Sequence, residues 1–311
     1  MFNVSPVRRG AAGAAYAVVF GVGACLAAAR ATADDVVGSP DVIGMLSEYR
    51  SAADDTLLDI ALSNGLGYVE LVAANPGVDP WLPGEGTTIV LPTAHVLPDA
   101  PRRGIVINLA AQRLYYFPSG SARVHTFPIG IGRAGLEMPL GGTVVVGKRA
   151  QPSWVPPPSI RSERPWLPAV VPPGPDNPLG DFALDLGWSG YVIHGTNLPY
   201  GIGRRVSHGC VRMHADDIRF LFGEIGAGAP VEVVDQPVKL GWRDGELYLE
   251  IHPSQAQADQ AQVSGSFRPE PIEGLLAMVR EAAGADPHRL DWALVARTAE
   301  ERRGIPVRVT R

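Results

Sequence analysis

This chain has only two cysteines, Cys25 and Cys210, among its 311 residues. So few cysteines exclude a disulfide-rich scaffold, in which several paired cysteines replace a large core. Charged residues make up 19% of the chain, the formal net charge is −5, and no long basic run occurs. Because nucleic-acid-binding proteins usually carry a basic stripe, we expect no nucleic-acid partner. After the N-terminal segment, no apolar run is long enough for a stable membrane span.

The N-terminal segment has the pattern of an export signal. Two arginines precede an almost wholly apolar or small stretch, residues 11–29, and Ala31-Thr32-Ala33 fits a signal cleavage site. We therefore predict a signal peptide over residues 1–33 and an exported mature protein. Two alternatives stay open: a membrane anchor that is kept, and lipidation at Cys25.

Removal of this signal leaves Cys210 without a second cysteine. Exported proteins usually pair their cysteines, so an unpaired one indicates a thiol that is needed for chemistry. Cys210 follows His208 by two residues and His194 by sixteen, and a nearby imidazole commonly lowers a thiol pKa and activates the nucleophile. Gly209 permits a tight turn and a close substrate approach. The pattern is typical of a cysteine acyl-transfer enzyme.

Residues 45–93 predict a small βααβ unit. We expect one helix from Asp55 or Thr56 to Asn64-Gly65, a second over 68–74 and a strand over 88–91. The patterns D-T-L-x-x-I-A, A-N-P and P-G-E-G-T-x-I-x-L-P resemble the lysin motif (LysM), a module that binds glycans containing N-acetylglucosamine, such as peptidoglycan. The resemblance implies glycan binding, and the alternative is a scaffold that keeps only the fold.

Residues 102–235 are predicted to be mainly β. The expected strands cover 103–108, 114–117, 124–131, 143–146, 182–186, 191–193 and 231–234, and a helix covers 216–225. We expect a β-hairpin extension over 236–252, then a linker and a helical C-terminal segment over 253–311.

A proline-rich segment interrupts the β-rich region. Residues 151–178 hold ten of the 29 prolines, together with Trp154 and Trp166. Disordered segments are poor in such aromatic residues, and a long loop within a domain is more often functional than structureless. We predict an ordered loop that lines the active site, and leave open whether it acts as a lid.

The motif around Cys210 carries the closest resemblance. It consists of His194-Gly195-Thr196 and Ser207-His208-Gly209-Cys210-Val211-Arg212. These match the signature H-G-T…[S/T]-H-G-C-x-R of the L,D-transpeptidase (YkuD-type) family, which the chain resembles over about residues 45–252. The LysM-like unit, the proline-rich loop and residues 236–251 are similar to its periplasmic Gram-negative branch. One departure is Met213-His214-Ala215, where Leu-x-x is more usual.

The resemblance implies a fold and a location. The fold would be α+β and mainly β, with a sandwich or barrel-like catalytic domain, and the location would be the periplasm. It implies no cofactor and no metal. A zinc site built from His194, His208 and Cys210 is disfavoured, because no fourth ligand has the usual spacing.

The resemblance also implies a reaction. Cys210 would attack the carbonyl between the third residue and the terminal D-Ala of a peptidoglycan tetrapeptide stem, release D-Ala and form a thioester. The acceptor would be an amine of another stem, giving a 3-3 cross-link, or the terminal lysine of an outer-membrane lipoprotein. Water as acceptor would make a carboxypeptidase, a hydrolase or a lipoprotein-detaching amidase. A non-catalytic wall-binding protein is a further alternative, against which the complete motif weighs.

Roles follow for the residues of the motif. His194, which leaves the end of a predicted strand, is the expected general base, and His208 is its rival or a residue that orients the loop or supports the oxyanion. The N–H groups of Gly209 and Cys210 are expected oxyanion donors. Ser207 is expected to hydrogen-bond within the loop.

Substrate binding is assigned to four further side chains. Arg212 would bind a stem carboxylate as a fork, or alternatively pair with Asp216 or Asp217. The other three are Thr196, Tyr200 and Trp154, of which the two aromatic residues would form walls or pack in the core.

Overall fold

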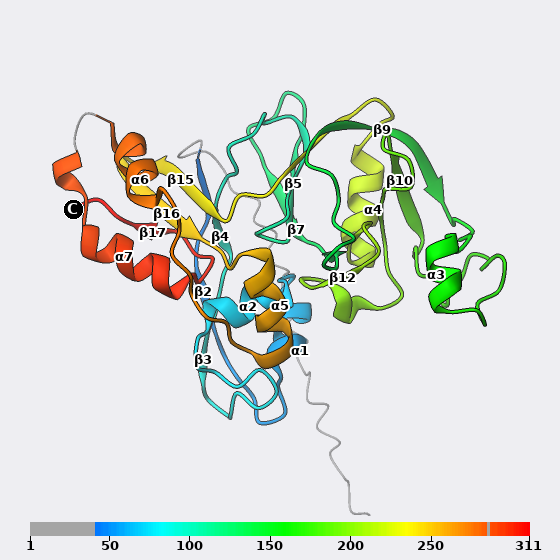
Figure 1. The fold of residues 1–311 in the computed structure, drawn as a ribbon, viewed down its shortest axis with the longest axis horizontal. Coiled ribbons are helices and arrows are strands. Elements are labelled where there is room, and N and C mark those ends of the chain that lie inside the picture. The colour runs from blue at the N-terminus through cyan, green and yellow to red at the C-terminus, as the bar shows by residue number, and fades with distance from the viewer. Residues whose placement is uncertain (1–40, 285–286) are drawn as a thin grey trace, which may run out of the picture.

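The computed structural model describes residues 41–284 and 287–311, which form a central sheet, an N-terminal unit and a C-terminal unit (Figure 1). The predicted signal peptide and the alternative lipidation at Cys25 lie outside the described residues. Within the described ranges, no single helix is long and apolar enough to cross a membrane.

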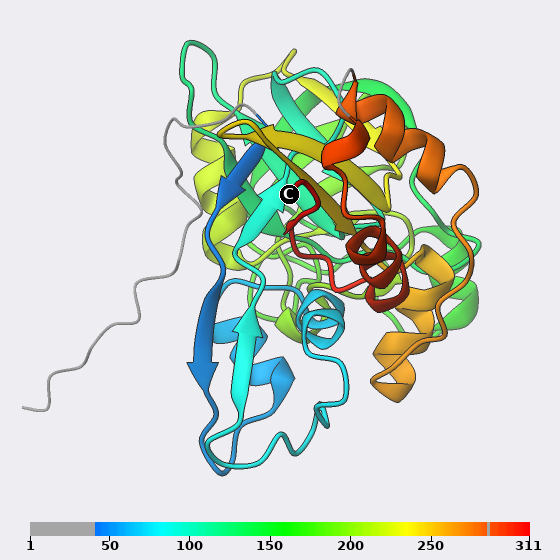
Figure 2. The same ribbon diagram turned by 90° about the vertical axis from the view of Figure 1, so that its left-hand side faces the viewer.

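The N-terminal unit, residues 41–97, is a two-stranded ribbon with two short helices. Its elements are β1 (Val42–Gly44), β2 (Ser47–Arg50), α1 (Leu57–Ser63), α2 (Tyr68–Ala74), β3 (Thr88–Leu91) and β4 (Ala94–Val96). β2 pairs with β3 and β1 with β4, both antiparallel, and Figure 2 shows the four strands as one long ribbon. Thr56 caps α1 by accepting from the Asp59 N–H. The predicted βααβ order is therefore present as β2–α1–α2–β3.

Eight strands form one curved sheet in the order β13-β11-β10-β9-β14-β5-β6-β7. They are β5 (Gly104–Asn108), β6 (Arg113–Phe117), β7 (His125–Pro128), β9 (Gly141–Ala150), β10 (Phe182–Leu186), β11 (Val192–His194), β13 (Val211–Arg212) and β14 (Pro230–Val234). The sheet is curled, and Gly130, two residues after the end of β7, forms an isolated bridge to Arg212 of the opposite edge strand β13. The mainly β, α+β character is as expected.

The predicted strand over 124–131 is broken. Its first part is β7, and its last part, β8 (Ile131–Gly132), pairs instead with β12 (Arg205–Ser207). The change of partner occurs at Gly130, whose N–H and C=O both bond to the Arg212 backbone, at 2.9 and 2.8 Å. This exchange ties the chain after β7 to the strand that follows Cys210.

The two faces of the sheet bury different partners, because side chains alternate along each strand. One face packs on α4 (Ala215–Glu224), whose Ile218 and Leu221 lie in the main core. That core also contains Ile107, Leu114, Leu184, Ile193, Val211 and Val231. The opposite face carries Val106 and Tyr115, covered by Ile43 and Leu97 of the N-terminal unit. The N-terminal unit thus covers the β5–β6 half of the face away from α4.

A buried ion pair joins the N-terminal unit to the sheet. Arg113 of β6 donates from Nε and Nη2 to the two carboxylate oxygens of Glu70 on α2, at 3.1 and 2.8 Å. Both side chains are 3% exposed. Nearby, burial holds the pKa of His95 well below its ordinary value, and the charges of Arg113 and Lys239 lower it further. His95 is therefore neutral, and the positive charge that pairs with the Glu70 carboxylate is that of Arg113.

The C-terminal unit is attached by a second buried pair. The predicted hairpin is present as β15 (Val238–Arg243) and β16 (Glu246–Ile251). Lys239 Nζ lies 2.6 Å from Glu250 Oε1 and donates to Val96 O (2.6 Å) and Tyr115 Oη (3.1 Å). The hairpin is thus hydrogen-bonded to both β4 and β6.

Elements after the predicted boundary at residue 252 pack on the hairpin that precedes it. After α5 (Gln255–Ser264), α6 (Leu275–Ala283) and α7 (Trp292–Glu301) pack on the hairpin, and β17 (Val307–Arg308) pairs with β16. Their shared core contains Leu247, Leu249, Ile251, Val279, Val295 and Val309. By contrast, α5 contributes Ala258 and Ala261 to the core of the N-terminal unit. A two-residue strand such as β17 is too short to show an alternation of apolar and polar residues in the sequence.

The N-terminal unit also touches the segment that leads to Cys210. Gly67, at the start of α2, lies against Gly203, and the Val69 N–H donates to Gly203 O at 3.1 Å. The Arg204 guanidinium lies 4.0 Å from the centre of the Tyr68 ring. This contact places α2 directly beside the approach to β12.

We expect Gly203→Ala to destabilise the protein more than a comparable glycine change elsewhere. Gly203 has φ +68, and an added Cβ would lie 2.2 Å from Gly67 Cα. Gly65 has φ +65 with nothing within 4 Å, so Gly65→Ala is a control that carries only backbone strain, about 1–2 kcal/mol. Urea unfolding should show a loss of free energy of unfolding roughly twice as large for Gly203→Ala. Equal losses would contradict the close contact.

Candidate functional site

The strands bring the site together on the half of the sheet face that the N-terminal unit leaves uncovered. Val192 and His194 are alternate residues of β11 and share this face. His194 is in register with Arg212 of β13, and Val192 with Asp185 of β10. Arg149 of β9 donates from Nε and Nη2 to the Asp185 carboxylate at 2.9 and 2.7 Å. One imidazole, two guanidinium groups and one carboxylate therefore line the same surface.

The turn before β13 holds Cys210. Ser207 Oγ donates to Cys210 O at 2.6 Å and accepts from the Gly209 N–H at 3.1 Å. Gly209 has φ +109, and an added Cβ would lie 3.1 Å from Tyr191 Cε1. The glycine is thus required both by the backbone conformation and by the space beside Tyr191. Ser207 therefore hydrogen-bonds within the loop, and its Oγ accepts from the Gly209 N–H, one of the two expected oxyanion donors.

The Cys210 thiol is enclosed by the β10–β11 turn. Sγ donates to Gly190 O at 3.6 Å. Burial raises the pKa of the Cys210 thiol, and this effect is opposed by the hydrogen bond from the Val192 N–H and by the positive charges of Arg212 and Arg149. Since burial is the largest cause, the thiol is neutral at pH 7.

His194 is buried and also neutral. The residue is 4% exposed, and Nδ1 lies 2.5 Å from Gly195 O. Because a carbonyl only accepts, Nδ1 carries the proton and Nε2 is free to accept one. Burial lowers the pKa of His194 to about 4, and the charge of Arg212 lowers it as well. The resting site therefore combines a neutral thiol with a neutral imidazole, where the sequence suggested a histidine that lowers the thiol pKa.

His208 has a different partner. Its Nε2 lies 3.0 Å from Glu163 Oε2, and Arg133 Nη2 donates to Glu163 Oε1 at 2.6 Å. The hydrogen bond from His208 holds the pKa of the Glu163 carboxyl below its ordinary value, and Arg133 contributes in the same direction. Glu163 is the last residue of α3 (Pro158–Glu163), which lies within the proline-rich loop. The histidine next to the nucleophile is therefore bound to that loop.

Arg212 is a largely buried guanidinium with spare donor capacity. Burial lowers its pKa, and the positive charge of Arg164, the residue after α3, lowers it further. Among the described residues, Arg212 Nε has no hydrogen-bond partner. Asp216, one of the alternative partners considered, pairs with Arg219 at 2.9 Å.

The proline-rich loop is ordered, as predicted. Trp154 and Val171 exchange backbone hydrogen bonds of 2.8 Å across its base. The fully buried Asn177 donates to Pro152 O at 2.7 Å and to Pro172 O at 3.1 Å. We call residues 151–178 the lid loop. Its ends are fixed to each other, and its helix α3 reaches His208.

The remaining predicted binding residues lie in less defined positions. Thr196 Oγ1 accepts from the Leu198 N–H at 3.0 Å. Tyr200 lies in the one-turn helix η1 (Pro199–Gly201) and is 54% exposed. Trp154 is half-buried at the base of the lid loop. In the described ranges, none of the three has a side-chain hydrogen bond or ring contact with Cys210 or His194.

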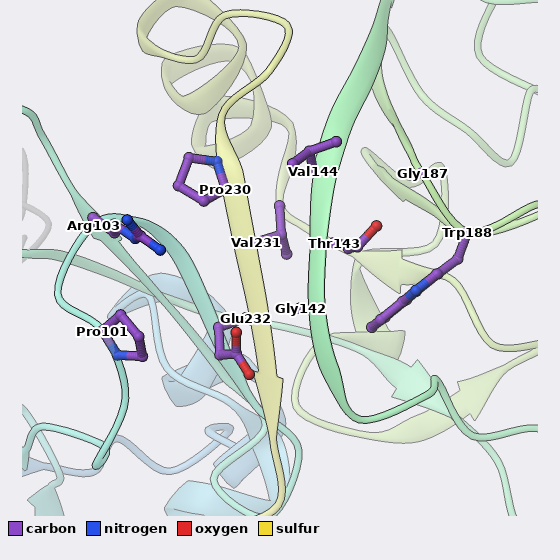
Figure 3. A pocket seen from close by; sticks show the side chains of 10 residues that line it. All are labelled: Pro101, Arg103, Gly142, Thr143, Val144, Gly187, Trp188, Pro230, Val231 and Glu232. Carbon is purple, nitrogen blue, oxygen red and sulfur yellow. The ribbon is translucent and has the colours of Figure 1, made fainter.

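A separate groove of about 470 Å³ is lined by residues of the paired strands β9 and β14 and of the segments beside them (Figure 3). Arg103 and Glu232 approach it from one side and Trp188 from the other. None of the predicted site residues lines it. Trp188 belongs to the same β10–β11 turn as Gly190, so the groove and the thiol adjoin one turn.

Sequence reasoning missed Arg149, Asp185, Glu163 and Arg133. Arg149 and Asp185 are 36 residues apart and meet only through the pairing of β9 with β10. Glu163 is one of two acidic residues in the proline-rich segment, with Asp176, and no spacing relates it to His208. The described residues contain no group of three or more His, Cys, Asp or Glu that could hold a metal.

Comparisons with known proteins identify the family of this chain. Residues 102–233 match the family model of the L,D-transpeptidase catalytic domain, YkuD. The chain is 41% identical over 260 residues to a Salmonella typhimurium protein named probable L,D-transpeptidase ErfK/SrfK, covering 82% of each chain. This chain belongs to the L,D-transpeptidase family. The predicted enzyme class is confirmed.

Two further similar proteins are a sequence relative and a solved structure. The probable L,D-transpeptidase YbiS of Escherichia coli K12 is 41% identical over 251 residues, 78% of this chain and 80% of that one. The NMR structure of the catalytic domain of the Enterococcus faecium L,D-transpeptidase is 21% identical, with a TM-score of 0.34. It covers 44% of this chain and 99% of that one.

The raised thiol pKa predicts slow alkylation of Cys210 at neutral pH. Its rate of reaction with iodoacetamide, followed by mass spectrometry of the Cys210 peptide, should rise only at alkaline pH, since the thiolate is the reacting form. Arg212→Gln should shift the rise to still higher pH, because the Arg212 charge lowers the thiol pKa. An inflection below pH 7 would indicate a preformed thiolate–imidazolium pair instead.

Proposed function

We propose that this L,D-transpeptidase uses Cys210 as a nucleophile toward the tetrapeptide stem of peptidoglycan and transfers the acyl group to an amine. The observation that carries the proposal is the position of Cys210 beside β11. The Val192 N–H forms a hydrogen bond with Sγ. His194 follows Val192 by two residues on the same strand face, which separates the two residues by about 6.6 Å along the strand. His194 therefore lies on the same strand face as Val192, and we assign its Nε2 as the base for the thiol.

The acylation step follows from these positions. Cys210 Sγ bonds to the carbonyl carbon before the terminal D-Ala, while the thiol proton passes to His194 Nε2. The tetrahedral intermediate then breaks its C–N bond, and the D-Ala nitrogen leaves with the proton from the imidazolium. A thioester remains on Cys210 and His194 is neutral again.

Transfer reverses the roles. An amine attacks the thioester carbon and loses a proton to His194, and the sulfur leaves and is reprotonated. The acceptor is an amine of a second stem or the terminal lysine of an outer-membrane lipoprotein. Because His194 is neutral over most of the pH range, it serves as base in both half-reactions without a resting ion pair.

We assign the oxyanion to the Cys210 N–H. The other expected donor, the Gly209 N–H, already donates to Ser207 Oγ at 3.1 Å. An oxyanion hole requires donors that point at the position of the developing charge. Gly209 then contributes by its conformation, which sets the direction of the next peptide group.

Arg212 is our choice for a stem carboxylate. Its Nε has no hydrogen-bond partner among the described residues. Its positive charge lowers the pKa values of Cys210 and His194. The charge of Arg164 lowers the pKa of Arg212 itself, so the two guanidinium groups repel each other. Bringing an anion between two guanidinium groups relieves that repulsion. Thr196, Tyr200 and Trp154 remain candidates for binding the rest of the stem.

The N-terminal unit fits a glycan-binding role next to this chemistry. Its β2–α1–α2–β3 order is that of a lysin motif, and it is docked on the segment that leads to β12. A glycan held there would keep its stem peptides near Cys210. The same substrate places the mature protein in the periplasm, after export directed by residues 1–33.

Products from purified muropeptides test the assignment. With tetrapeptide stems, the protein should release D-Ala and yield 3-3 dimers or, with a lipoprotein C-terminal peptide, a lysine adduct, all resolved by mass spectrometry. Cys210→Ala should abolish both, and His194→Gln should slow them by roughly 10²–10⁴-fold. His288→Gln, an exposed histidine in the C-terminal unit, is the matched control. Activity that survives Cys210→Ala would refute the proposal, and tripeptide alone would indicate water as acceptor.

The acid limit of activity should lie near pH 4. His194 accepts a proton only when neutral, and its pKa is lowered to about 4, so kcat/KM should persist at pH 5 and fall below about pH 4. An ordinary histidine would lose activity already near its pKa of about 6.5. A kcat/KM profile between pH 3.5 and 8 measures this limit. A midpoint near 6.5 would assign the base to a less buried histidine.

A further inference from the structure

The lid loop meets the catalytic turn through one carboxylate. Glu163 lies between His208, on the turn that ends in Cys210, and Arg133, which follows β8. Both contacts are short, at 3.0 and 2.6 Å. Since the base of the loop is already closed by Asn177 and by the Trp154–Val171 bridge, Glu163 fixes its other end.

We propose that Glu163 is a positioning residue: it holds His208 as the Nε2-protonated ring and keeps α3 over the catalytic turn. A carboxylate at 3.0 Å accepts only from an N–H, so it selects the proton on Nε2. The ring is thereby held with Nδ1 turned away from the lid loop. His208 lies two residues before the nucleophile, so its orientation is passed to the turn itself.

The same contact determines where the positive charge of the loop lies. Arg164 follows Glu163 directly, and its charge acts on Arg212. Two like charges repel, so an attraction must hold α3 in place, and the Glu163 contacts with His208 and Arg133 supply it. Arg161 fixes the other side of α3 by donating to Pro156 O (3.0 Å) and Ala169 O (2.9 Å). Release of Glu163 would free α3 and remove Arg164 from the carboxylate site.

This inference rests on the proposed function for its kinetic part only. The variants are Glu163→Gln, which keeps an acceptor without the charge, and Glu163→Ala, which keeps neither. Asp176→Asn is the control, since it removes one negative charge from the same loop at an exposed position. Amide hydrogen exchange in peptides covering 158–171 should speed up in Glu163→Ala, less in Glu163→Gln, and not in Asp176→Asn.

The state of His208 gives a second readout. Nitrogen-15 spectra of the histidine rings should show His208 as the Nε2–H form in the parent protein and as a mixture of tautomers in Glu163→Ala. Glu163→Gln should keep the Nε2–H form because its amide oxygen still accepts. A merely structural role of Glu163 would leave the tautomer unchanged.

Turnover gives the third readout. We expect kcat for stem transfer to fall roughly 10- to 100-fold in Glu163→Ala, as for loss of other groups that orient a histidine, with Asp176→Asn unchanged. The proposal is overturned if exchange, tautomer and kcat of Glu163→Ala all match the control. If the parent protein transfers no stems, the proposed function fails, while exchange and tautomer still decide the role of Glu163.

Discussion

The buried ion pair between Glu70 and Arg113 is the contact on which the rest of the arrangement depends. It lies between α2 and β6 with both side chains 3% exposed, and two hydrogen bonds join its guanidinium and carboxylate groups. Loss of one partner of such a pair leaves an uncompensated charge, at a cost of about 3–5 kcal/mol. The pair therefore admits one docking position for the N-terminal unit on the sheet.

That docking divides one face of the sheet into two halves. The β5–β6 half is closed by the N-terminal unit and by the Lys239–Glu250 pair of the C-terminal hairpin. The half formed by β9, β10, β11 and β13 stays available for Arg149, Asp185, His194 and Arg212. The other face is filled by α4. The residues to which we assign the chemistry thus lie on the half of this face that the N-terminal and C-terminal units leave uncovered.

Burial then sets the electrostatics of this surface. It raises the pKa of Cys210 and lowers that of His194, so both partners rest uncharged. The neighbouring guanidinium groups act in the opposite direction on the thiol and partly offset its burial. In the mechanism that we propose, charge forms only as the substrate carbonyl is attacked, and the Cys210 N–H is the donor assigned to the oxyanion.

The sequence by itself determined much of the local structure and predicts the identity of the reacting groups. Thr56 and Asn64 delimit α1, the N-P after Ala74 ends α2, and the H-G-T and S-H-G-C-x-R segments predict the nucleophile and its histidines. These signals are carried by residues close together in the chain. A strand as short as β17 and the break at Gly130 escape such reading, because partners distant in sequence decide both.

Only the tertiary structure decided which histidine faces which partner. Strand register sets His194 beside Arg212, and the lid loop brings Glu163 to His208 across 45 residues. It also decided the protonation states of Cys210 and His194, because burial cannot be read from the spacing of residues. The sequence alone suggested a lowered pKa for the Cys210 thiol, whereas burial in the fold raises it. The identity of a side chain fixes its chemistry, while its pKa and partners depend on how much water the folded chain excludes.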